Sequence, residues 1–396
     1  MSGPLAGVRV LDLTRILAGP YAASLLADMG ADVVKVERPG DGDETRHMAP
    51  SQAGESHYFM SINRNKRGIA VDMKQPAGRQ VVLDLARAAD VFIENFRPGV
   101  TGRLGLDYEA VKAVRPDVVY CSISAYGQTG PYAGRSAFDV AIQAMGGAMS
   151  VTGEPGGRPM RMGLPMADLS AGLFAALGIL AAVVERQRAR QGQLVDISMM
   201  DAMVGLLTQY AGRYFMTGED VPPVGSGHPS VSPYGTYETA DGHIVIANLG
   251  ETFWPKIARA LGLAELAEDP RYRTNPERVS RRAEVDALVN AATRERTTAE
   301  WEAIFEKEDV PHAPVLKVSQ VLTHPQVLAR EMVTEVEHAT LGRIPATGRA
   351  IRFGAHGKEA MRASPVLGQH TDEVLREIVG DDQARVDELR ESGIIA

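Results

Sequence analysis

The sequence has almost no cysteine, because Cys121 is the single one among 396 residues. An internal disulfide is therefore excluded, and the composition is typical of a reducing compartment. Long apolar runs are also missing: the longest, at 173–184, is too short to cross a membrane and is followed by Glu185. The first residues lack a basic region followed by an apolar run, so we expect no signal peptide.

Positive charge is not in excess either. The 42 lysines and arginines are outnumbered by 50 acidic residues, which gives a net charge of -8. A protein whose main partner is a nucleic acid normally carries a basic surface, so no nucleic-acid partner is expected. These absences together predict a cytoplasmic protein that acts on small molecules and has no membrane partner.

The common catalytic signatures are absent. The chain has no Gly-x-Ser-x-Gly elbow, no P-loop, no His-Glu-x-x-His and no Cys-x-x-Cys. Its nine histidines are scattered, so we expect no metal site and no tightly bound cofactor. Cys121 lies in an apolar stretch and is interpreted as a core residue. His228 lies in a glycine-rich loop, where both a surface position and a contact with a ligand remain open.

Strand and helix patterns alternate through the first half of the chain. Apolar strands are predicted at 8–13, 31–37, 68–72, 90–94, 117–124 and 192–198, with helical segments between them. This alternation favours an α/β fold with a parallel, Rossmann-like sheet. The dinucleotide fingerprint is missing, because the turn after the first strand has one glycine, Gly19, where three are expected.

Turn-forming residues predict the domain boundaries. The stretch 218–233 is rich in glycine, proline and serine, and a hairpin is predicted at 235–247 with its turn at Asp241-Gly242. We therefore expect a large Rossmann-like domain at 1–217 and a smaller α+β domain at 218–325. The segment 326–396 is expected to return to the large domain.

One acidic residue stands where a long apolar helix is predicted to begin. Pro165 cannot lie inside the helix expected at 169–187, so Asp168 falls close to the helix start. Two interpretations are open. Asp168 is an N-cap that accepts a backbone N–H, or the helix N-terminus keeps a half-buried carboxylate ionised so that it can act as a nucleophile.

Several cations are predicted on loops at strand ends. Singly, each is most simply a solvated surface charge; together, at the ligand-binding edge of an α/β sheet, they suit a polyphosphate. They are Arg38, Lys74, Arg97, Arg103 and Arg135.

At this point the chain resembles a known family. It is similar to the class III coenzyme A-transferases, which include formyl-CoA transferase, and to the related 2-methylacyl-CoA racemases. The similarity covers essentially the whole chain. The segments that carry it are 4–13 (PLAGVRVLDL), 17–20 (LAGP), 30–39 (GADVVKVERP), 63–67 (NRNKR), 94–99 (ENFRPG), 127–131 (GQTGP), Asp168, 192–198 (GQLVDIS), 314–316 (PVL) and 367–371 (LGQHT).

The resemblance implies a large Rossmann-like domain, a small domain and two chains interlocked as a homodimer. It implies Asp168 as the catalytic nucleophile. It further implies a substrate loop with Gly225, Gly227 and His228, where a longer glycine run is shortened, and Leu17 where formyl-CoA transferase has glutamine. Both departures disfavour oxalate as the acceptor. The implied CoA contacts are Arg38, Lys74, Asn95, Phe96, Arg97, Arg103 and Arg135.

Three functions follow from this pattern. A racemase needs two bases, and the position of the family's histidine holds Phe138, so transfer is favoured over racemisation. A CoA-transferase would move CoA from a donor such as succinyl-CoA to a small carboxylic or dicarboxylic acid, through an aspartyl anhydride and an aspartyl-CoA thioester. Backbone N–H groups beside Asp168 or in the glycine loop would hold the oxyanion, and Arg46 and Arg64 would be partners for a distal carboxylate. A non-catalytic acyl-CoA binder is the third possibility.

Overall fold

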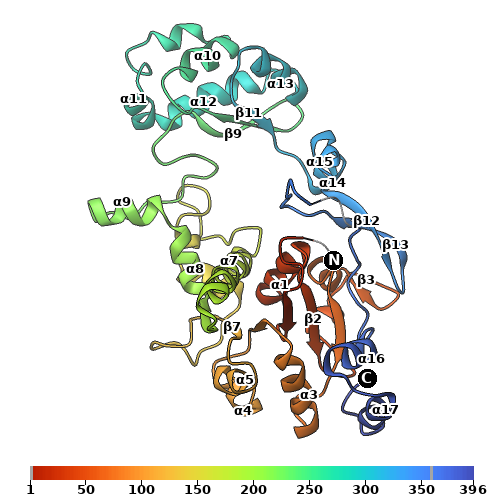
Figure 1. Ribbon diagram of the computed structural model, residues 1–396. Helices are drawn as coiled ribbons and strands as arrows, with labels where there is room; N and C mark the ends of the chain where they lie inside the picture. Colours follow the sequence, from red (N-terminus) through yellow and green to blue (C-terminus); the bar gives the residue numbers. More distant parts are fainter. Residues whose placement is uncertain (1–2, 357–359) are drawn as a thin grey trace. The chain divides into compact units, whose positions relative to one another are not determined.

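The computed structural model describes residues 3–356 and 360–396 and divides into two compact units (Figure 1). The large unit comprises the chain up to Gly147, residues Gly163–Thr208 and residues Pro325–Ala396. The small unit comprises Ala148–Met162 and Gln209–His324. Residues 148–162 and helix α9 (Gln209–Thr217), which the predicted large domain includes, thus lie in the small unit.

A parallel sheet of six strands organises the large unit. Its order is β5-β2-β1-β6-β7-β8, so the chain adds strands first to one side of β1 and then to the other. This is the strand order of dinucleotide-binding folds, and it confirms the predicted α/β class with a Rossmann-like sheet. The strands are β1 (Arg9–Asp12), β2 (Asp32–Glu37), β5 (Arg67–Ala70), β6 (Val91–Glu94), β7 (Val119–Ser124) and β8 (Gln193–Ser198).

One face of the sheet packs on a hydrophobic cluster. Leu11, Val34, Ile69 and Phe92 point into it from four strands, because alternate residues of a strand face the same side. The helices that close this face are α3 (Pro76–Arg87), α5 (Tyr108–Val114), α16 (Thr371–Val374), the π-helix η4 (Leu375–Val379) and α17 (Gln383–Glu391). The chain end joins the same layer, where Ala396 N donates to Ala70 O.

Helix α7 (Met166–Ala189) is the longest helix and starts close to where the sequence predicts it. It packs on α1 (Ala18–Asp28), β7 and β8. A Cβ on Gly172 would lie 2.7 Å from Ala18 O, so the two backbones approach more closely than any other residue would allow. The helix has 24 residues and is long and apolar enough to cross a membrane. The expectation that the apolar run 173–184 is too short to do so is therefore corrected, because the helix extends beyond this run at both ends. Nine of its residues are buried.

The mostly apolar stretch 199–216 forms two helices rather than one. Helix α8 (Met199–Leu206) ends before Thr208, whose φ of 35° lies outside the helical region, and α9 follows. The large unit also contains η1 (Glu44–His47), β3 (Ser51–Gln52), β4 (Glu55–Ser56), α2 (His57–Ile62), α4 (Val100–Leu104), α6 (Asp139–Met145), α15 (Pro325–Ala329), β12 (Val333–His338) and β13 (Gly342–Thr347).

The small unit is built on the predicted hairpin. Strands β9 (Tyr234–Glu238) and β10 (His243–Ala247) are antiparallel, and β11 (His312–Pro314) extends them to a three-stranded sheet. Trp254, Ile257 and Phe305 fill the core beneath it. Its helices are η2 (Ala148–Ser150), α10 (Phe253–Ala260), η3 (Ala264–Ala267), α11 (Asn275–Ser280), α12 (Arg282–Thr293), α13 (Thr298–Lys307) and α14 (Val318–Thr323).

Candidate active site

Asp168 is the third residue of α7 and is half-buried. The N-cap position belongs to Pro165, whose side chain has no group to cap with. The capping carboxylate comes instead from Asp139, the first residue of α6: its Oδ1 accepts Ala167 N–H at 2.8 Å and Asp168 N–H at 3.3 Å. The interpretation of Asp168 as an N-cap is therefore wrong, because Asp139 performs that role.

The environment of Asp168 favours its neutral form. Burial, and secondarily the charge of Asp139, raise the pKa of Asp168 to about 7. Burial and the charge of Asp139 oppose the expectation that the helix N-terminus keeps this carboxylate ionised, and the nearest N–H groups are already bound by Asp139. The same contacts correct a second expectation: the N–H groups of Ala167 and Asp168 are not available to hold an oxyanion.

Tyr58 is a site residue that the sequence patterns did not single out. It lies on α2, and burial together with the charges of Asp168, Asp139 and Asp43 raises its pKa. Its phenol therefore keeps its proton at neutral pH and can donate a hydrogen bond near the Asp168 carboxyl. No spacing in the sequence indicates this, since 110 residues separate it from Asp168.

Phe138 precedes the capping aspartate and is 75% exposed. It supplies no base at the position where a racemase is expected to have histidine. Cys121 is fully buried within β7, as predicted. Among residues 3–356 and 360–396, no three His, Cys, Asp or Glu side chains are grouped so that they could hold a metal ion.

The predicted CoA-binding residues all belong to the large unit, and those on loops follow the carboxyl ends of its strands. Arg38 follows β2, Lys74 follows β5 and Arg97 follows β6; all three side chains are exposed. Arg38 forms an ion pair with Asp41, whereas no carboxylate of the described residues pairs with Lys74 or Arg97. The remaining cations, on α4 and before α6, are Arg103 and Arg135.

The loop after β6 is held in place from two sides. Asn95 and Arg15 exchange hydrogen bonds across the switch point between β1 and β6: Arg15 N donates to Asn95 Oδ1 at 2.8 Å, and Asn95 Nδ2 donates to Arg15 O at 2.7 Å. Phe96 is buried, and its N–H donates to the buried carboxyl of Glu94 at 2.8 Å. Both residues thus shape the loop, and Arg97 is the one that projects into solvent.

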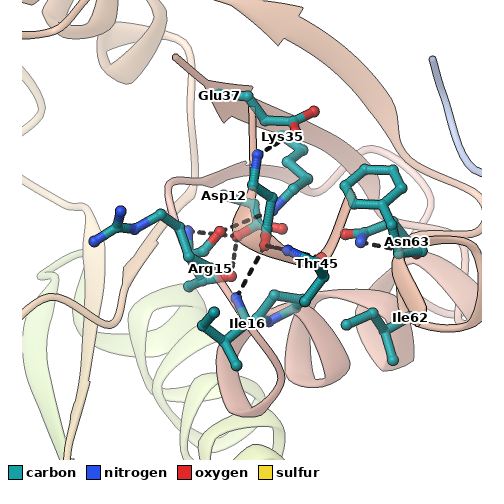
Figure 2. A network of polar contacts seen from close by, with 12 residues as sticks. Asp12, Arg15, Ile16, Lys35, Glu37, Thr45, Ile62 and Asn63 are labelled. Carbon is teal, nitrogen blue, oxygen red and sulfur yellow. Dashed lines mark hydrogen bonds and ion pairs between the residues drawn. The ribbon is translucent and has the colours of Figure 1, made fainter. Parts of the chain in front are cut away.

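Beneath this edge lies a buried network of charges (Figure 2). Lys35 pairs with Asp43 at 3.0 Å, and Lys66 pairs with Asp12 at 2.9 Å; all four side chains are inaccessible to solvent. Although burial lowers the pKa of Lys35, the charges of Asp43, Asp12 and Glu37 raise it above its ordinary value overall. For Lys66, burial dominates and lowers the pKa to about 8.

The network fixes the loop after β1. Asp43 Oδ1 accepts the N–H of Ile16, whose φ of 67° is strained for a β-branched residue. Lys35 Nζ donates to Thr14 O, and Thr14 N–H donates to Asp12. The residues quoted above for 63–67 have structural roles here, since Asn63 accepts from Lys66 and Arg67 pairs with Asp32.

Arg46 and Arg64, which were expected as partners for a distal carboxylate, are both paired with carboxylates of the protein itself. Arg46 is paired with Glu37 at 2.7 Å and stacks on Phe59, and it is almost buried. Arg64 is paired with Asp28 and also bonds Thr347. Both guanidinium groups are therefore neutralised within the protein.

The predicted substrate loop belongs to the small unit. Gly225 has a φ of 61°, and its N–H donates to Gly153 O at 2.9 Å. Gly227 N–H closes a turn on Val224 O. The carbonyl of His228 accepts from Arg282, and the His228 ring lies 5.5 Å from that of Tyr234.

The fold is thus an α/β protein of Rossmann strand order without a dinucleotide fingerprint, with a half-buried carboxyl at the start of α7 and exposed cations on loops that follow the strands. Residues 5–371 match the model of CoA-transferase family III, and the chain belongs to this family. It is therefore an enzyme, a class III CoA-transferase, and the predicted family is confirmed.

Similar proteins are known from several organisms. A mouse (Mus musculus) succinyl-CoA:glutarate CoA-transferase is 41% identical over 393 residues, which cover 99% of this chain and 90% of that protein. A succinate–glutarate CoA-transferase of Agrobacterium fabrum is 37% identical, with 95% and 96% covered. The crystal structure of a CAIB/BAIF family protein from Brucella suis superposes with a TM-score of 0.87 at 38% identity, covering 96% of this chain and 100% of that chain.

Proposed function

We propose that this enzyme transfers CoA from succinyl-CoA to a five-carbon dicarboxylic acid such as glutarate, with Asp168 as the nucleophile. The observation that carries the proposal is the half-buried Asp168 carboxyl, which no cation among the described residues pairs with. An unpaired carboxylate can attack a thioester, whereas one held in an ion pair is a weaker nucleophile. The names of the mouse and Agrobacterium relatives support the donor and the acceptor.

The reaction has four balanced steps. The Asp168 carboxylate attacks the thioester carbonyl of the donor, the C–S bond breaks, and an acyl-aspartyl anhydride and CoA thiolate form. The thiolate attacks the aspartyl carbonyl and releases the donor acid, which leaves an aspartyl-CoA thioester. The acceptor carboxylate attacks this thioester and expels the thiolate, which then takes the acyl group from the new anhydride. No net proton is consumed, because a carboxylate enters and a carboxylate leaves.

The surrounding residues support these steps. The protonated phenol of Tyr58 is a hydrogen-bond donor available to a developing oxyanion. Arg38, Lys74, Arg97, Arg103 and Arg135 are cations suited to the phosphates of CoA, and guanidinium groups pair with phosphate oxygens in a bidentate manner. The fixed loop at Asn95 and Phe96 would present Arg97 to that ligand.

We further propose that the enzyme works as an interlocked homodimer, as the family resemblance implies. Exposed apolar residues on α7 support a protein partner on this face; they are Leu173, Phe174, Leu177 and Val184. Contiguous apolar patches of this kind are typical of protein interfaces.

Intact-protein mass spectrometry tests the proposed chemistry. After addition of succinyl-CoA we expect a covalent adduct on wild-type enzyme that borohydride or hydroxylamine traps at Asp168 and that glutarate discharges. The variant Asp168→Asn should form no adduct and lose at least about 10⁴-fold in kcat, because its amide is not a nucleophile. Its CoA binding should be retained.

Two outcomes would overturn the proposal. Undiminished exchange by Asp168→Asn would exclude this residue as the nucleophile. Exchange of the α-proton of a 2-methylacyl-CoA with deuterated solvent, without an adduct, would favour racemisation instead.

A further inference from the structure

We propose that Asp139 is a positioning residue for the nucleophile: it holds the first turn of α7 by two backbone N–H groups and sets the charge beside Asp168. This inference rests on the proposed role of Asp168 and adds a second carboxylate with a distinct task. Asp139 touches the helix that carries the reacting group and is not itself assigned a contact with substrate.

The Asp139 carboxylate accepts three hydrogen bonds. Its Oδ1 accepts from Ala167 N at 2.8 Å and from Asp168 N at 3.3 Å, and its Oδ2 accepts from Gln143 Nε2 at 2.7 Å. Gln143 is fully buried and lies one turn along α6, so it fixes the orientation of the carboxylate. The first turn of α7 is therefore docked on α6 through one buried amide and one carboxylate.

This arrangement differs from an ordinary cap. A capping side chain normally comes from the residue that precedes the helix, and it leaves the remaining N–H groups of the first turn exposed to an anion. Here the cap comes from a separate helix, 29 residues earlier, and binds the backbone N–H of the nucleophile's own residue. A movement of α6 would thus be transmitted directly to the position of the Asp168 carboxyl.

The charged group that acts on Asp168 is negative, so it raises the pKa of this carboxyl. Asp139 on α6 acts on this carboxyl, whose charge in turn acts on Tyr58 of α2, and α1 places the Tyr21 ring one turn further along at Gly172. The acidic residue at the start of α8, Asp201, is exposed. With no cation of the described residues paired to Asp168, the negative charge of Asp139 favours the protonated form.

The variant Asp139→Asn separates charge from shape. Its side-chain oxygen can still accept the two N–H groups, and a flipped Gln143 amide can accept from the new NH₂ group. We expect the acid limb of the kcat–pH profile to move to lower pH by roughly half a unit to one unit, because a like charge is removed. The pKa of Asp168, followed by carboxyl ¹³C NMR and assigned with Asp168→Asn, should move in the same direction.

The variant Asp139→Ala removes the acceptor as well. We expect kcat to fall by about 10- to 100-fold, since a small misplacement of a reacting group is costly, while the KM for succinyl-CoA changes little. Asp139→Ser keeps one oxygen acceptor without charge, so its kcat should lie between those of Asp139→Asn and Asp139→Ala. It replaces Asp139→Ala in the experiment if the alanine variant does not fold. Asp201→Asn removes a carboxylate from the first turn of another helix and should leave the pH profile unchanged.

The outcomes distinguish this inference from the proposed function. If Asp139→Asn leaves both the NMR pKa and the acid limb of the wild type unchanged, the charge role is excluded. If Asp139→Ala and Asp139→Ser keep wild-type kcat, the positioning role is excluded. The NMR titration reads Asp168 directly, so it gives an answer even if no acyl adduct forms and the nucleophile assignment itself fails.

Discussion

At the scale of single residues, the feature with the largest chemical consequence is the ionisation of Asp168. Because the pKa of Asp168 is raised to about 7, protonated and ionised carboxyl groups are both populated near neutral pH, and the protonated form cannot act as a nucleophile. The ionised form is the proposed nucleophile, so activity should be gained as the pH rises through this value and lost as it falls. The higher basicity also makes the ionised carboxylate a better nucleophile than an ordinary surface aspartate.

This gives a pH prediction for the wild-type enzyme. The rate of adduct formation in a single turnover with succinyl-CoA should fall about tenfold for each pH unit well below 7, and it should level off above about pH 8. Rapid-quench mass spectrometry between pH 5.5 and 8.5 measures it. A rate that stays constant down to pH 5.5 would mean that the carboxylate is ionised throughout.

The same residues show how far sequence alone could go. Proline, an acidic residue and an apolar run predict a helix start close to Asp168, and the family resemblance implies its catalytic role. Asp139 and Tyr58 were not predicted, because their relation to Asp168 depends on how α6, α2 and α7 meet in space. The strands were largely predicted, since buried parallel strands are short, continuous apolar runs. The break between α8 and α9 near Thr208 lies in a mostly apolar stretch without a proline.

At the scale of elements, the buried charges join β1, β2 and the loops that follow them. Asp12 and Lys35 face each other in the register of β1 and β2, and Lys66 reaches Asp12 from the chain just before β5. Burying these charges costs free energy, which their mutual attraction and hydrogen bonds offset only while every partner is present. The network therefore favours one conformation of the strained Ile16 loop over its alternatives.

Removal of one partner should be costly. Lys66→Met leaves the buried Asp12 carboxylate without its cation, and we expect a loss of about 3–5 kcal/mol in the free energy of unfolding. In the double variant Lys66→Met/Asp12→Asn the loss should be smaller, because the uncompensated charge is gone while Thr14 N–H keeps its acceptor. Urea unfolding of these two variants and of the single variant Asp12→Asn measures the coupling, and strictly additive losses would show that the pair does not interact.

At the scale of the whole molecule, the apolar face of α7 determines the expected assembly. Leu177 is 61% exposed near the middle of this helix. Leaving several such side chains in water is unfavourable by about 25 cal/mol for each Å² of apolar surface, so a second chain that covers them would be stabilised. The interlocked homodimer proposed above would use this surface.

A single charge should weaken that assembly. Leu177→Glu would place a carboxylate in the proposed apolar interface, and we expect a shift from dimer to monomer in light scattering after size exclusion. Leu249→Glu, at an equally exposed leucine of the small unit, is the matched control and should remain dimeric. A wild-type protein that is monomeric at all concentrations would exclude the proposal.

Helix α7 is held at both ends. Asp139 binds its first turn, and about 27 Å further along the helix Arg186 pairs with Asp90 at 2.6 Å and with Asp117 at 3.2 Å, just before β6 and β7. The helix that carries Asp168 is thus clamped by α6 at its first turn and by the residues before β6 and β7 at its last turn, whereas the cations proposed to bind CoA lie outside this helix. For protein engineering, this separates the position of the reactive carboxyl from the binding of the acid. Loops can be exchanged to accept another acid while Asp168 keeps its place, provided that the contacts of Asp139 and Arg186 are left intact.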